Sequence, residues 1–235
     1  MMADAGTAGP APYGDLRSMR QHGLLHAIFA GLMMLGIMAS DAAMAQGKRP
    51  VRIVALGDSL TAGYGLPAQA AFPAQLQQAL KARGHNVEIV NAGVSGDTAA
   101  GGLERLDWSV GEGVDGVVLE LGANDMLRGV DPASTRRSLE TIVQRLKARN
   151  IPVLMAGMLA SRNLGPEYAA RFDAIYPDIA KAYGLVLYPF FLDGVAGQRS
   201  LNLADGIHPN PEGVRVIVER MLPTVERFIA RLRPA

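Results

Sequence analysis

The chain has 235 residues, with 23 Lys and Arg against 22 Asp and Glu, and no cysteine. Its 49% apolar and 19% charged residues are typical of a globular protein and exclude a long disordered or collagen-like chain. The formal charge of +1 argues against nucleic acid as the main partner. Disulfides, thiolate nucleophiles and thiolate metal sites are excluded, so any nucleophile must be an oxygen or a nitrogen.

The first 45 residues are typical of a secretory signal peptide. Two arginines precede an uncharged run at 27–39, which an Ala-Met-Ala site follows at 43–45. These are the three parts of such a leader, so we expect cleavage after Ala45. The run is shorter than the roughly 20 residues of a transmembrane helix, so we expect no stable membrane span after cleavage. Translation from Met1 and from Met19 are both compatible with this leader.

Residues 46–235 are predicted to form one domain built on a parallel sheet. Short apolar runs alternate with amphipathic stretches, as they do in βα units. This alternation predicts a mainly parallel five-stranded sheet covered by helices on both faces, a three-layer α/β/α fold of the flavodoxin-like kind. Strands are expected at 51–56, 87–90, 114–121, 152–156 and 185–188.

Amphipathic stretches between and after the strands predict the helices. One covers 73–83, and another opens at Asp131-Pro132, an N-cap followed by proline at the first helical position. The stretch 167–183 predicts a helix that Pro177 kinks. The last helix is expected at 211–232, where apolar residues line one side.

Residues with useful chemistry follow several of the predicted strands, where ligands bind in folds of this kind. The first strand leads into a glycine-bracketed turn that contains Ser59, and the second ends near Gly93, where the backbone can approach a ligand closely. The third strand leads to Asn124, whose carboxamide can donate hydrogen bonds. Before the last helix, Asp205 and His208 are three residues apart.

Each of these signals also has an ordinary structural interpretation. The glycine-serine turn is equally suited to a phosphate or flavin phosphate, and the other residues are common in turns and caps. Their joint occurrence at the strand ends favours a catalytic site. Residues 46–235 contain two histidines, and His85 lies at a helix-to-strand turn on the opposite edge of the predicted sheet. We therefore expect His208 to be the base.

At these positions the sequence resembles the SGNH or GDSL hydrolases, and the resemblance extends from Val51 to the last helix. It rests on four blocks: Gly57-Asp58-Ser59-Leu60, Asn91-Ala92-Gly93, Gly122-Ala123-Asn124-Asp125 and Asp205-Gly206-Ile207-His208-Pro209. Ala123 stands where a second glycine is common in the family. Stretches at 121–129, 175–177 and 189–191 most resemble the periplasmic arylesterase branch, which includes the multifunctional acyl-CoA thioesterase and lysophospholipase.

The resemblance implies a Ser-His-Asp acyl-enzyme mechanism that uses no metal and no organic cofactor. It implies that Ser59 Oγ attacks an ester or thioester carbonyl and that His208 takes up and returns the proton. Asp205 would orient His208. The implied oxyanion hole consists of the backbone N–H groups of Ser59 and Gly93 and the side-chain amide of Asn124.

The implied substrates are small-molecule or lipid esters and thioesters, met by a periplasmic or secreted enzyme. Apolar residues after the fourth and fifth strands are expected to line an acyl groove, and the same residues are equally suited to core packing: Met158, Leu159, Leu164, Phe190 and Phe191. Three alternatives stay open. They are a carbohydrate acetylesterase on the same fold, a flavodoxin-like module that binds phosphate or flavin, and a catalytically silent lipid- or partner-binding protein.

Overall fold

The computed structural model describes residue 9 and residues 49–232. The apolar run at 27–39 and the expected cleavage site after Ala45 lie outside the described residues. Within the described part, no helix is both long enough and apolar enough to cross a membrane.

A five-stranded sheet forms the centre of the domain. Its strand order is β2-β1-β3-β4-β5, and every neighbouring pair is parallel. This is the order of the flavodoxin-like folds, so the predicted fold class is confirmed. The strands are β1 (Val51–Gly57), β2 (Val87–Gly93), β3 (Gly116–Glu120), β4 (Val153–Ala156) and β5 (Val186–Tyr188).

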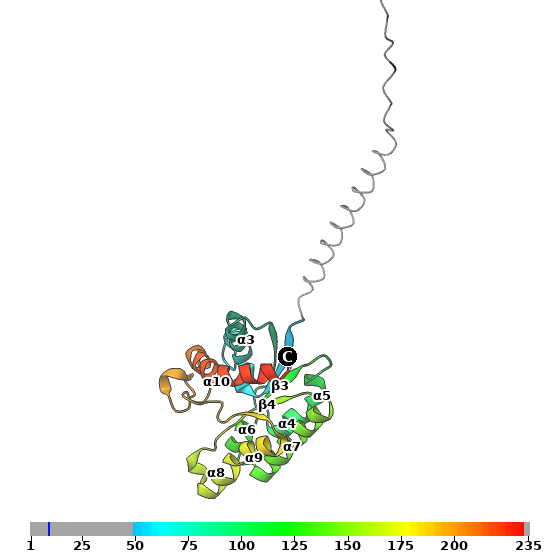
Figure 1. Cartoon of the computed structure of the whole chain (residues 1–235). Helices are drawn as coiled ribbons and strands as arrows, with labels where there is room; N and C mark the ends of the chain where they lie inside the picture. The colour runs from blue at the N-terminus through cyan, green and yellow to red at the C-terminus, as the bar shows by residue number, and fades with distance from the viewer. Residues whose placement is uncertain (1–8, 10–48, 233–235) are drawn as a thin grey trace, which may run out of the picture. The chain divides into compact units, whose positions relative to one another are not determined.

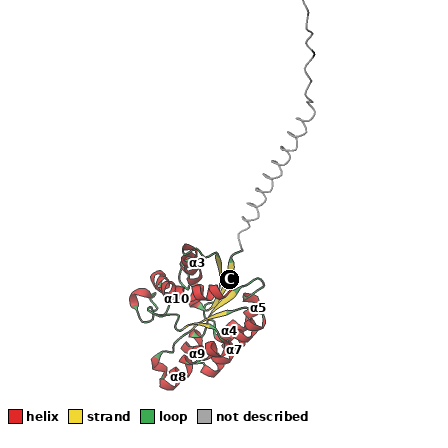
Figure 2. Ribbon diagram, viewed as in Figure 1, coloured by secondary structure: helices red, strands yellow, loops and turns green. Residues whose placement is uncertain are grey.

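Helices cover both faces of this sheet, as Figure 1 shows. On one face α3 (Phe72–Ala82) packs against α10 (Pro211–Leu232). On the other face lie α4 (Ala99–Glu104), α7 (Pro132–Ala148), α8 (Pro166–Asp173) and α9 (Ile175–Tyr183). In Figure 2 the yellow strands run between these two red layers. Burial on both faces explains why β3 and β4 are continuous apolar runs apart from Glu120.

The start of α7 follows the predicted N-cap. Asp131 accepts a hydrogen bond from the backbone N–H of Ala133 at 3.2 Å, and Pro132 takes the first helical position. The apolar stripe of this helix is buried against the sheet at Leu139, Ile142, Val143 and Leu146.

The segment predicted as one kinked helix at 167–183 forms two helices instead. Helix α8 ends at Asp173 and α9 begins at Ile175, with Ala174 between them. Pro177 has no N–H, and its ring would clash with the carbonyl of Asp173 four residues earlier. The interruption therefore lies at Ala174, and Pro177 sits in the first turn of α9, where a missing N–H costs little.

Several short helices were not predicted, and two of them begin directly after strands. These are α2 (Ser59–Ala62), which follows β1, and α6 (Ala123–Leu127), which follows β3. Between other elements lie α5 (Leu106–Ser109) and the 3₁₀ turns η1 (Ala68–Ala70), η2 (Arg162–Leu164) and η3 (Arg199–Leu201).

The register of the strands aligns their carboxyl ends. Gly57 at the end of β1 is the partner of Gly93 on one side and of Glu120 on the other. The turns after β1, β2 and β3 therefore start at one level of the sheet, next to one another.

Candidate active site

Ser59 is the first residue of α2 and is 8% exposed. Asp58 caps this short helix, because its Oδ1 accepts a hydrogen bond from the backbone N–H of Leu60 at 2.9 Å. As the first helical residue, Ser59 has a backbone N–H without an intrahelical acceptor. The turn thus presents the hydroxyl and a backbone donor of the same residue.

A chain of short contacts joins Ser59 to His208 and Asp205. The Nε2 atom of His208 lies 2.9 Å from Ser59 Oγ, and its Nδ1 lies 2.7 Å from Asp205 Oδ2. The other carboxylate oxygen of Asp205 accepts the backbone N–H groups of His208 and Ile207, each at 3.0 Å. Hydrogen bonds from the backbone of His208, from its side chain and from Ile207 lower the pKa of Asp205 to about 2. Asp205 is therefore ionised at neutral pH and holds the imidazole in place.

The loop that presents Asp205 and His208 is tied down at both ends. Asn202 and Pro209 form an antiparallel bridge, and the N–H of Leu203 donates to the carbonyl of His208 at 2.7 Å. Asn210 Oδ1 then accepts the N–H of Gly213 at 3.0 Å in the first turn of α10. The position of His208 is thus fixed relative to the last helix.

The other two predicted oxyanion donors lie beside Ser59, but each has a protein partner. The N–H of Gly93 donates to Asn91 Oδ1 at 2.9 Å. The side-chain nitrogen of Asn124 donates to Asp58 Oδ2 at 3.0 Å and to the carbonyl of Asp97 at 2.9 Å. The carboxamide therefore belongs to a network that includes the N-cap of α2.

Gly93 is needed for close packing. A Cβ at this position would lie 2.2 Å from the backbone nitrogen of Ala62 and 2.8 Å from the carbonyl oxygen of Asp58. The close approach predicted for this glycine is thus an approach to the backbone of α2, the helix that carries Ser59.

Two buried carboxyl groups lie beneath the site, and neither was among the predicted site residues. Asp58 is fully buried and Glu120 is 1% exposed. Burial raises the pKa of Asp58 to about 6, and burial together with the charge of Asp58 raises the pKa of Glu120 well above its usual range. Glu120 Oε2 accepts the hydroxyl of Thr61 at 2.7 Å, whereas Oε1 has no partner among the described residues. The sequence does contain one signal for Glu120, because a glutamate that belongs to an otherwise apolar, buried strand is unusual.

Arg105 was also missed, although it joins the ends of two strands. Its guanidinium donates to the carbonyls of Gly57 and Ala92, each at 2.8 Å, and pairs with Asp97 at 2.5 Å. It thus fixes the loop whose Asp97 carbonyl contacts Asn124.

A cavity of about 380 Å³ opens beside Ser59 and His208. Of the residues predicted for an acyl groove, Met158, Leu159 and Phe190 line it. Leu164 and Phe191 do not, which corrects that expectation. Phe191 is fully buried and packs edge-to-face on Phe72, with ring centroids 4.9 Å apart. Other apolar residues that line this cavity were not predicted from the sequence: Leu60, Met126, Leu127, Leu192 and Ile207.

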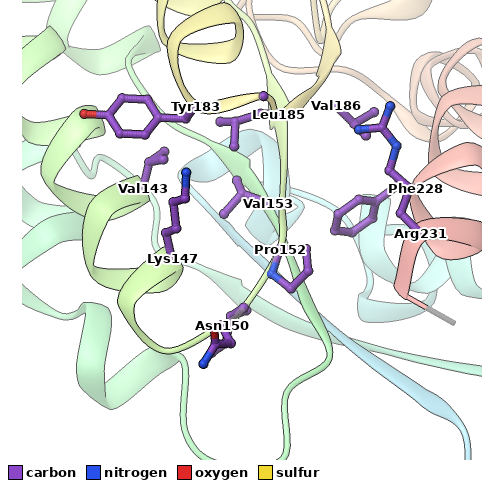
Figure 3. Close-up of a pocket in the computed structure, with 12 residues that line it drawn as sticks. Val143, Lys147, Asn150, Pro152, Val153, Tyr183, Leu185, Val186, Phe228 and Arg231 are labelled. Atoms are coloured by element: carbon purple, nitrogen blue, oxygen red, sulfur yellow. The ribbon is translucent and has the colours of Figure 1, made fainter. Parts of the chain in front are cut away.

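A second cavity, of about 410 Å³, lies at the amino-terminal ends of β4 and β5. Figure 3 shows Lys147 from α7 and Arg231 from α10 on opposite sides of it. His85 also lies away from Ser59 and His208, and its Nε2 contacts Glu226 of α10 at 3.2 Å. Within the described residues, no group of three or more His, Asp or Glu side chains is arranged to hold a metal ion.

Comparisons with known proteins agree with this geometry. Residues 55–216 match the GDSL-like Lipase/Acylhydrolase family. Over 178 residues the chain is 38% identical to Esterase TesA of Pseudomonas aeruginosa, an alignment that covers 75% of this chain and 89% of that protein. It is 37% identical to the Arylesterase of Vibrio mimicus, over 72% of this chain and 84% of the relative. It is also 37% identical to Thioesterase 1/protease 1/lysophospholipase L1 of Escherichia coli, over 75% of this chain and 84% of that protein.

Solved structures give the same result. The crystal structure of AlinE4, an SGNH-hydrolase family esterase, is 43% identical and superposes with a TM-score of 0.66 over 78% of this chain and 98% of that one. The esterase EstA of Pseudoalteromonas, inhibited by monoethylphosphonate, is 30% identical with a TM-score of 0.72 over 76% of this chain and 98% of that one. The chain therefore belongs to the GDSL-like lipase/acylhydrolase family of carboxylic ester hydrolases.

Proposed function

We propose that the protein hydrolyses esters through an acyl-enzyme formed on Ser59. His208 Nε2 removes the proton from Ser59 Oγ as the oxygen attacks the substrate carbonyl, and returns it to the leaving alcohol or thiol. Water then attacks the acyl-enzyme with the same imidazole as base. Asp205 stays ionised and stabilises the imidazolium that forms in each half of the reaction. The observation that best supports this mechanism is the 2.9 Å contact between Ser59 Oγ and His208 Nε2, next to the 2.7 Å contact of His208 with Asp205.

The negative charge that develops on the carbonyl oxygen needs fixed donors. The N–H of Ser59 is the first of these, and the N–H of Gly93 and the amide of Asn124 lie in the neighbouring turns. To bind the oxyanion, Gly93 exchanges its hydrogen bond to Asn91, and Asn124 exchanges its hydrogen bond to the carbonyl of Asp97. Each such donor contributes about 10²- to 10³-fold to the rate.

The substrates proposed here are esters with an apolar acyl chain, in the range of arylesterase, thioesterase and lysophospholipase activities. The apolar residues that line the cavity beside Ser59, Met158, Leu159 and Phe190 among them, support this choice. An acetyl group would leave most of a 380 Å³ cavity empty, which argues against the carbohydrate acetylesterase alternative.

The predicted leader at 1–45 supports a periplasmic or secreted location for the enzyme. The formal charge of +1 argues against nucleic acid as a partner.

The test compares the mature protein, residues 46–235, with its Ser59→Ala variant on p-nitrophenyl acetate, butyrate and octanoate and on a lysophospholipid. We expect Ser59→Ala to lower kcat by about 10³-fold or more. The control is Ser200→Ala, because Ser200 is exposed and its hydroxyl makes no hydrogen bond within the described residues. Turnover by Ser59→Ala at the wild-type rate would refute the mechanism, and equal kcat/KM for the three acyl chains would refute the apolar acyl site.

A further inference from the structure

Tyr64 occupies an unusual position for a large aromatic side chain. Its ring centroid lies 4.5 Å from that of His208, with the two planes tilted by 35°, and the residue is 52% exposed. Gly63 adopts the left-handed conformation (φ 82°) that ends α2 and turns the chain back, so the N–H of Tyr64 donates to the carbonyl of Ser59 at 3.1 Å. The backbone of Tyr64 is thereby tied to Ser59, and its ring to His208.

The tyrosine hydroxyl makes no hydrogen bond to any residue in the described part of the chain. Tyr64 also does not line the cavity proposed for the acyl chain, whereas Ser59 and His208 do. The ring therefore covers the imidazole outside that cavity, and it leaves about half of its surface open to solvent.

The proposed mechanism determines which part of the substrate passes this ring. In the tetrahedral intermediate the carbon is bonded to Ser59 Oγ, the oxyanion, the acyl chain and the leaving oxygen. The oxyanion faces the backbone N–H of Ser59, and the acyl chain lies in the apolar cavity. The leaving oxygen must come within about 3 Å of His208 Nε2 to receive its proton. The group attached to that oxygen therefore extends along the imidazole, where Tyr64 is the exposed aromatic ring in contact with His208.

We propose that Tyr64 forms the binding surface for the leaving group and gives the enzyme a preference for esters of aromatic alcohols. The proposal rests on the function proposed above, whose range includes arylesterase activity, and it adds the residue that binds the aromatic alcohol. An aryl ring stacks on the open part of Tyr64, whereas an alkyl group of similar size gains only apolar contact. An aromatic pair contributes enough to change kcat/KM by about two- to twelve-fold.

The experiment measures one ratio, kcat/KM for phenyl butyrate divided by kcat/KM for 2,2,2-trifluoroethyl butyrate. The acyl chain is the same in both esters, and their intrinsic reactivities cancel when the ratio is compared between proteins. We expect the ratio to fall about two- to twelve-fold in Tyr64→Leu and to stay at the wild-type value in Tyr64→Phe, which keeps the ring. Phenol, the product, should inhibit wild type and Tyr64→Phe more strongly than Tyr64→Leu by a similar factor.

The matched control is Trp108→Leu, which removes an 84% exposed aromatic ring from α5 and should leave the ratio unchanged. A second non-aromatic variant, Tyr64→Gln, serves if Tyr64→Leu does not fold, as judged by circular dichroism. Equal losses on both esters in the non-aromatic variants, with an unchanged ratio, would show that Tyr64 only supports His208 and would overturn the proposal. Full activity of Ser59→Ala would instead overturn the mechanism itself, so the two failures are distinguishable.

Discussion

Asp58 connects the nucleophile to one of the proposed oxyanion donors through a single carboxylate. One oxygen accepts the N–H of Leu60 at the start of α2, and the other accepts the amide of Asn124. In Asp58→Asn, one of these donors must face an N–H group whichever way the new amide is turned. We expect kcat to fall by about 10²-fold with little change in KM, because the donor to the oxyanion is misplaced. Steady-state kinetics on p-nitrophenyl butyrate measure this, with circular dichroism to verify folding. A wild-type kcat would exclude a positioning role for Asp58.

Glu120 makes the stability of the protein depend on pH. Its pKa is raised in the folded state, so between pH 4.5 and that raised value the folded chain binds a proton that the unfolded chain has released. The free energy of unfolding therefore falls as pH rises, by up to about 1.4 kcal/mol per pH unit for one group. Glu120→Gln has no such titratable group, so its stability relative to wild type should increase as the pH rises from 4.5 toward that raised value.

Urea unfolding at several pH values in this range tests the prediction, with Glu112→Gln as the control because Glu112 is exposed. Parallel stability curves for wild type and Glu120→Gln would contradict it.

The contrast between the residues found and missed has a physical reason. Ser59, Asp205 and His208 belong to short local patterns, so the sequence alone indicated them. The hydrogen bond between Thr61 of α2 and Glu120 of β3 joins residues that are 59 positions apart in the sequence, and it depends on how β1 and β3 align. Phe191 was assigned to the acyl groove because it follows a strand, but its ring packs into the core against Phe72, a contact with a residue 119 positions earlier that no local pattern indicates.

At the scale of elements, the contact between the end of β2 and α2 has no room for a side chain. In Gly93→Ala the new methyl group would lie 2.2 Å from the nitrogen of Ala62, so α2 must move and take Ser59 with it. We expect a loss of stability of about 1 to 3 kcal/mol and a fall in kcat of about 10²-fold or more. Thermal unfolding and kinetics test this. The control is Gly111→Ala, where an added Cβ meets no atom within 4 Å; equal effects of the two substitutions would contradict the prediction.

The elements that the sequence predicted well are those with a long enough pattern. Strands β3 and β4 are buried along their whole length and appear as apolar runs in the sequence. Helix α10 was placed at 211–232 because its apolar stripe spans many turns. Helices α2, α4, α5 and α6 have four to six residues, which is too short for a helical period to be visible. The break at Ala174 depends on a steric clash with Pro177, and the sequence pattern placed it three residues too late.

At the scale of the whole molecule, we propose that the leader predicted at 1–45 directs the enzyme out of the cytoplasm. We expect the full chain to be exported and cleaved after Ala45, so that the mature protein begins at Gln46. Leu35→Arg places a charge in the apolar run and should keep the unprocessed chain inside the cell. Mass spectrometry of periplasmic and cytoplasmic fractions measures both outcomes, with Leu127→Arg in the mature part as the control. Processing of Leu35→Arg at the wild-type level would contradict the prediction.

The contact between Ser59 and His208 joins residues that are 149 positions apart, and His208 lies three residues before α10, which packs against α3. A nascent or truncated chain that lacks α10 has the nucleophile but cannot hold the base beside it. Ester hydrolysis is therefore a reporter of complete folding. During refolding, we therefore expect esterase activity to appear only after α10 has docked.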